Sequence, residues 1–143
     1  MKNFEKLPQI EQYKVKNHIS NLVNLCTIDG KFSKSEYEIM LSICDRYGLP
    51  KSEFVDIIKG NFASEYIIPS DTYEKLEQLY DFVRVTLADH KIETGELEVC
   101  KHVAMTLQIK KEAINSLIMS MIEYINAGST FDSVKMHLYA QTV

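Results

Sequence analysis

The chain has 143 residues, of which 45% are hydrophobic and 25% charged, and its formal net charge is -4 at pH 7. This composition is ordinary for a single globular domain with a sizeable core, and the acidic balance argues against nucleic acid or an anionic membrane as a partner. Only 3 prolines and 5 glycines interrupt the chain, so long helices are favoured over a turn-rich β fold.

No apolar run reaches the length of a membrane span, and the first residues lack the apolar core of a signal peptide. We therefore expect a cytoplasmic protein with no membrane segment. The three cysteines, Cys26, Cys44 and Cys100, lie in apolar helical patterns without CxxC spacing, which is typical of buried core thiols in that compartment.

Three helices are expected in the first half, over residues 8–29, 33–48 and 50–60. The first has an apolar stripe that begins at Ile10, with apolar residues three and four positions apart. Ser33 and Glu36 have the S-x-x-E spacing of a capping box, which predicts the start of the second helix. Gly48 and Gly60 are expected to end the second and third helices, since glycine adopts the left-handed backbone without strain.

Residues 61–70 break the helical period, but their apolar content predicts that they pack on the domain instead of forming a loose linker. Four helices are expected after them, over residues 71–87, 93 or 94 to 107, 110–126 and 130–140. Ser70 or Asp71 is expected to cap the first of these, and Ser129 or Thr130 the last. The helix at 110–126 is the most apolar and is expected to be the most buried.

The two halves of the chain, about 10–60 and 71–126, align without a gap at an offset of sixty residues. Asp29 aligns with Asp89 and Glu36 with Glu96, and many other aligned pairs are both apolar. The alignment predicts an all-α fold in which two helix–turn–helix–helix halves bury their apolar faces against each other about a pseudo-two-fold axis, as one domain over 1–143 with a C-terminal helix at 130–140.

The acidic turns are open to two interpretations. A standard EF-hand is excluded, because Leu25 and Thr27 stand at the first two ligand positions of the first loop, and Val85 and Leu87 at those of the second. The structural interpretation is that the carboxylates cap helices and turns. The functional one is that the turns meet and the four carboxylates bind a divalent cation, because hard cations prefer such oxygen ligands.

The sequence Asp-Gly-Lys-Phe-Ser-Lys-Ser-Glu at 29–36, and its counterpart from Asp89 to Glu96, resemble the TerB-like family, which includes the tellurite-resistance protein TerB and the N-terminal domain of a DnaJ-like co-chaperone. The resemblance covers about residues 10–126. It implies an all-helical, non-enzymatic cytoplasmic module linked to stress or tellurite resistance. The family's proposed metal ligands correspond to Asp29, Glu36, Asp89 and Glu96. His90 departs from the pattern, which has glycine there.

The functional prediction is therefore a non-enzymatic stress-response module with no certain cofactor and a divalent cation as the candidate ligand. The alternative is a protein-interaction scaffold whose acidic turns are structural only. Protein partners are expected in either case, and the sequence leaves open a homodimer.

Overall fold

The computed structural model describes residues 3–27, 32–65, 67–89 and 93–143. In order, its elements are η1 (Phe4–Lys6), α1 (Gln9–Cys26), α2 (Lys34–Tyr47), α3 (Lys51–Ile58), α4 (Thr72–Thr86), η2 (Leu87–Asp89), α5 (Thr94–Thr106), α6 (Lys111–Asn126) and α7 (Phe131–Ala140). The described residues contain seven α-helices and no strand, so the predicted all-α class is confirmed. The chain divides into two compact units, Met1–Ile67 and Ile68–Val143.

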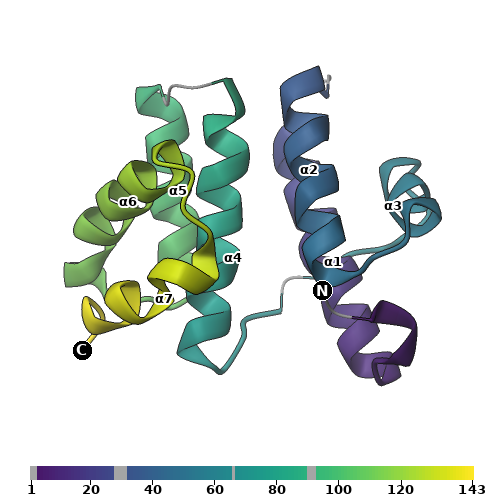
Figure 1. Cartoon of the computed structure of the whole chain (residues 1–143), viewed down its shortest axis with the longest axis horizontal. Coiled ribbons are helices and arrows are strands. Elements are labelled where there is room, and N and C mark those ends of the chain that lie inside the picture. The colour runs from purple at the N-terminus through teal and green to yellow at the C-terminus, as the bar shows by residue number, and fades with distance from the viewer. Residues whose placement is uncertain (1–2, 28–31, 66, 90–92) are drawn as a thin grey trace. The chain divides into compact units, whose positions relative to one another are not determined.

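In the first unit, α1 packs against both α2 and α3, which also contact each other (Figure 1). Its most deeply buried apolar side chains are Ile19, Leu22, Met40, Ile43 and Phe54, each 0% exposed. Burying a side chain of this size stabilises the fold by roughly 1.5–3 kcal/mol relative to leaving it in water. The placement of Ile10 in the apolar stripe of α1 is wrong, because Ile10 lies in the first turn of the helix and is 59% exposed.

The segment after α3 packs on α1, as its apolar content predicted. The ring of Phe62 lies 5.5 Å from that of Tyr13, and the Lys16 ammonium lies 5.1 Å from the centre of the Phe62 ring. The backbone N–H of Glu65 donates to Oδ1 of Asn17 at 2.7 Å. Because Asn17 is only 3% exposed, this bond fixes the segment to the helix through a buried side chain.

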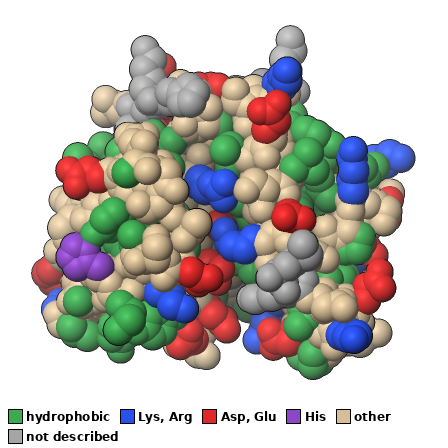
Figure 2. Space-filling view, viewed as in Figure 1, with side chains coloured by type: hydrophobic (Ala, Val, Ile, Leu, Met, Phe, Trp, Pro, Cys, Tyr) green, Lys and Arg blue, Asp and Glu red, His purple; other side chains and the backbone are tan. Residues whose placement is uncertain are grey.

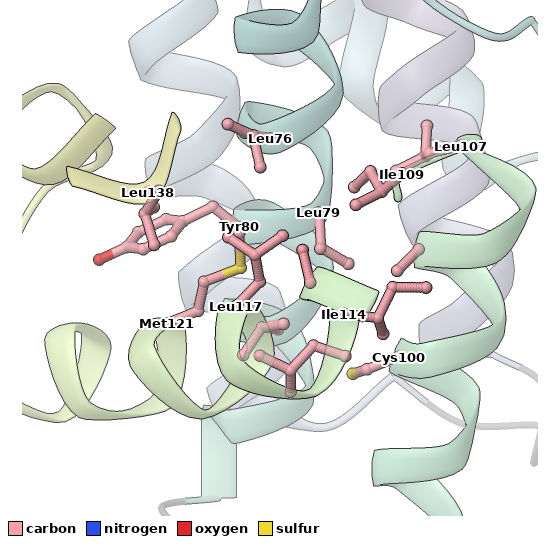
Figure 3. Packing of buried hydrophobic residues seen from close by; sticks show 14 of the residues in the cluster. Leu76, Leu79, Tyr80, Cys100, Leu107, Ile109, Ile114, Leu117, Met121 and Leu138 are labelled. Atoms are coloured by element: carbon pink, nitrogen blue, oxygen red, sulfur yellow. The ribbon is translucent and has the colours of Figure 1, made fainter. Parts of the chain in front are cut away.

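In the second unit, α4 packs against α5, α6, α7 and η2. A single cluster of buried apolar residues joins the four α-helices, and Figure 3 shows Tyr80, Leu117, Met121 and Leu138 lying together in it. The expectation that α6 is the most buried helix is wrong. Seven residues of α4 are buried, compared with five of α6, because an apolar composition does not by itself bury every apolar position; Met119 of α6 is 55% exposed.

α7 is attached to α4 and α6 by aromatic and polar contacts at the edges of this cluster. The Tyr73 and Tyr139 rings stack with centres 4.7 Å apart, and the Tyr80 hydroxyl donates to the Ser129 carbonyl at 2.7 Å. Gln141, the residue after α7, donates through its amide to Ser120 of α6 and accepts from Ser116, both at 3.1 Å. Burial raises the pKa of Tyr80 to about 12, so its hydroxyl keeps the donated proton further into alkaline pH than an ordinary tyrosine does.

Two of the three pairs of corresponding helices begin sixty residues apart, whereas α1 and α4 begin at Gln9 and Thr72. Lys34 and Thr94 begin α2 and α5, and Lys51 and Lys111 begin α3 and α6. The packing pairs within each unit also correspond: α1 with α2 and α3, and α4 with α5 and α6. The three cysteines are all buried, as expected from their apolar surroundings. None of the described helices combines the length and apolarity needed to cross a membrane.

Candidate functional site

Ser33 and Glu36 form the predicted capping box at the start of α2. The Ser33 hydroxyl accepts from the Glu36 backbone N–H at 3.0 Å, and the Ser33 N–H donates to Glu36 Oε1 at 2.9 Å. The backbone N–H groups of Ser33 and Glu36, which have no carbonyl partner within the helix, thereby gain acceptors. The glutamate thus has a structural function that engages one of its two carboxylate oxygens.

An apolar contact that sequence reasoning missed accompanies this capping box. The Phe32 ring packs edge-on against that of Tyr37 with centres 6.1 Å apart, and Tyr37 in turn contacts Phe54 of α3. Phe32 directly precedes the N-cap and Tyr37 is the fourth helical residue, which is the spacing of a hydrophobic staple. That spacing is readable in the sequence, and it explains why the turn carries an aromatic residue.

At the start of α5 a glutamate again accepts a hydrogen bond from the backbone N–H of the N-cap residue. The backbone N–H of Glu93, the N-cap residue, donates to Glu96 Oε1 at 3.1 Å. Unlike Glu36, which is half-buried, Glu96 is exposed. The two glutamates proposed as metal ligands therefore both bind the backbone N–H three residues earlier.

The four predicted ligands are described unequally. Asp29 lies outside the described residues, as does His90. Asp89 is exposed and ends η2, which precedes the α5 turn. Glu36 belongs to the first unit, and Asp89 and Glu96 belong to the second. Within the described part of the chain, no three His, Cys, Asp or Glu side chains are grouped closely enough to hold a metal ion. The four-carboxylate site stays a prediction.

The Cys100 thiol lies one turn beyond Glu96, on the buried side of α5 (Figure 3). Burial raises its pKa, and the nearby Glu96 carboxylate adds to that effect, while a 3.6 Å hydrogen bond with the Thr86 hydroxyl opposes it. Because the thiolate is the form that attacks electrophiles and binds soft metals, Cys100 is held in its unreactive form. This supports the structural interpretation of the cysteine.

A surface depression of about 410 Å³ lies in the first unit where α2 turns into α3. Its lining comes from two helices and the turn between them. The periodicity of apolar residues within one helix therefore could not predict it. The lining residues are Leu41, Ser42, Cys44, Asp45, Leu49, Lys51 and Phe54.

Comparisons of the chain with models of protein families, with curated proteins and with solved structures find no match.

Proposed function

We propose that the chain is a non-enzymatic helical module of the TerB-like kind, which binds a divalent cation through the acidic turns that precede α2 and α5. The proposed ligands are Asp29, Glu36, Asp89 and Glu96. Cytoplasmic location and a role in stress or tellurite resistance, with protein partners, belong to the same proposal through the resemblance of the two turns.

The observation that carries the proposal is the repeated turn. A glutamate at the third position of the following helix accepts from the N-cap N–H in both units, at 2.9 and 3.1 Å. Each hydrogen bond fixes one carboxylate oxygen and so orients the side chain at the end of its turn. An oriented carboxylate is a suitable ligand for a hard cation, which accepts oxygen donors from several chain segments. The sixty-residue spacing between the starts of α2 and α5, and between those of α3 and α6, supports the duplicated fold that the family implies.

Capping and cation binding can be separated by one conservative substitution. Glutamine retains the carbonyl oxygen that accepts the N-cap N–H but lacks the negative charge that strengthens the binding of a divalent cation. We expect Ca²⁺ or Zn²⁺ to raise the Tm of the native chain, and Glu36→Gln and Glu96→Gln to keep the metal-free Tm while losing that rise. A ligand bound only by the folded state at about a hundredfold excess over Kd adds about 2.7 kcal/mol.

The matched control is Glu112→Gln, because Glu112, like Glu96, is an exposed glutamate in the first turn of a helix, α6, but lies in neither acidic turn. It should leave the metal-dependent rise intact. A Tm that does not change with millimolar metal would contradict the cation site. Asp29→Asn and Asp89→Asn should abolish the effect as well, and if they do not, the metal binds elsewhere.

The second candidate is a protein-interaction scaffold with purely structural caps. It is favoured by large apolar side chains on the surface of the second unit, among them Val99, 40% exposed, and Met105, 59% exposed. A scaffold predicts no response to metal, and it predicts loss of stability, in the metal-free protein, for Glu36→Ala and Glu96→Ala but not for the glutamine variants.

A further inference from the structure

The five described methionines fall into two sharply different classes. Met40 and Met121 are 0% exposed. Met105, Met119 and Met136 are 59%, 55% and 75% exposed, on α5, α6 and α7 respectively. Methionine is ordinarily among the most buried residue types, so three accessible thioethers on three different helices of one unit are unusual.

Exposure decides which thioethers an oxidant reaches. A methionine sulfur is neutral at every pH, so its reactivity does not depend on a neighbouring charge in the way that a thiol's does. The buried pair is enclosed by the cores of the two units, and Figure 3 shows Met121 among Tyr80 and Leu117. An oxidant reaches such a side chain only when the surrounding structure opens.

We propose that Met105, Met119 and Met136 are reversible oxidation sites at which the folded second unit reacts with hydroperoxides. In each reaction a sulfur lone pair attacks a peroxide oxygen, the O–O bond breaks and an S–O bond forms. The thioether is oxidised by two electrons to the sulfoxide. The peroxide is reduced to water or an alcohol, with its proton passing to the departing oxygen.

The position of these side chains lets the fold tolerate the product. A sulfoxide is polar and disrupts a core that contains it. At the three exposed positions the added oxygen faces water, and hydrophobic side chains on the visible surface lie in separate patches among polar and charged ones (Figure 2). The three cysteines are buried, so among the residues that the structure describes the exposed thioethers are the sulfur atoms most accessible to a peroxide.

The test is native peroxide treatment of the full chain, followed by quenching, digestion and mass measurement of each methionine-containing peptide. We expect Met136, Met105 and Met119 to gain one oxygen each, at least about tenfold faster than Met40 and Met121, because the buried pair reacts only through open states. In guanidinium the five rates should become similar. Comparable rates for all five in the native chain would overturn the proposal.

Two further measurements test tolerance and reversal. The Tm of the oxidised chain should lie within about 3 °C of the untreated Tm, as for ordinary surface substitutions. A methionine sulfoxide reductase with a dithiol should restore the original peptide masses. A larger fall in Tm, or sulfoxides that the reductase does not remove from the folded chain, would overturn reversible oxidation at these sites.

The matched variant carries Met105→Leu, Met119→Leu and Met136→Leu together, which keeps the side-chain volume at each site. It should melt like the parent chain and lose the three fast oxygen additions. Fast additions that persist in this variant at Met40, Met121 or the cysteines would show that exposure does not govern oxidation of this chain.

Discussion

Gln108 has a backbone conformation that is ordinarily left to glycine. Its φ is 62°, and Gly48, sixty residues earlier, has a φ of 70°. Both residues follow a helix, and in both cases the N–H of the next residue bonds back to a carbonyl five positions before it, at 2.9 Å from Leu49 to Cys44 and 3.2 Å from Ile109 to Ala104. Leu49 and Ile109 are buried, so the left-handed residue turns the chain back into the core.

Gln108→Gly should therefore stabilise the chain. A side chain in the left-handed region costs about 1–2 kcal/mol, and the extra freedom of glycine in the unfolded chain offsets part of the gain. We expect the free energy of unfolding to rise by about 0.5–1 kcal/mol, measured by urea denaturation. Gly48→Ala is the matched opposite and should lower it by about 1 kcal/mol. An unchanged or lower midpoint for Gln108→Gly would contradict this account of the turn.

The expectation that glycine ends helices succeeds at some single residues and fails at others. Gly48 and Gly60 were expected to end helices, and both have positive φ values. The end of α5 carries no glycine, and nothing in the local sequence identified Gln108 as the residue that takes this conformation. Its strain is sustained by tertiary packing, through Ile109, which a residue-by-residue propensity does not include.

Among the helices and connecting segments, side-chain caps made the helix starts predictable. Ser33, Asp71 and Thr130 each accept a hydrogen bond from a backbone N–H of the helix that follows. The short 3-10 turns Phe4–Lys6 and Leu87–Asp89 were not predicted, because three residues are too few to produce a period. The segment after α3 was predicted to pack, but its partner, Asn17 of α1, came from the structure.

Asn17→Ala should release the segment after α3 from α1. The substitution removes the acceptor of the Glu65 N–H in a part-buried hydrogen bond, and losing a bond of this kind costs about 0.5–1.5 kcal/mol. We expect faster hydrogen exchange at the Glu65 amide together with a loss of stability in that range. Asn24→Ala is the control, because Asn24 is an exposed asparagine on the same helix. Equal changes in stability and in Glu65 amide exchange for the two substitutions would show that they report helix propensity and not the hydrogen bond between Asn17 and Glu65.

At the scale of the whole molecule, an apolar cluster of 17 buried residues lies entirely within the second unit. Its buried members run from Leu76 to Leu138 and are drawn from every α-helix after Ile67. A core that is complete within one stretch of chain needs no residue from elsewhere to exclude water. Whether the four carboxylates meet could not be predicted in the same way. The periodicity of apolar residues shows which face of a helix is buried, but it carries no information on where two compact units place their turns.

We expect a fragment of residues 68–143 to fold without the first unit, giving helical far-UV circular dichroism and a cooperative thermal transition. A fragment of residues 68–129 is the control, because it lacks α7 and with it Phe131, Val134 and Leu138 of the cluster. The shorter fragment should lose cooperativity. A longer fragment that melts without a transition would show that the second unit depends on the first.

The stacked pair of Tyr73 and Tyr139 gives the molecule a built-in optical reporter. The chain contains no tryptophan, so tyrosines dominate its absorption near 280 nm. The two rings are tilted by only 15° at 4.7 Å, and they join the first turn of α4 to the last turn of α7. Electronic coupling between them exists only while α7 is docked, so undocking of that helix changes the near-ultraviolet spectrum without any attached dye.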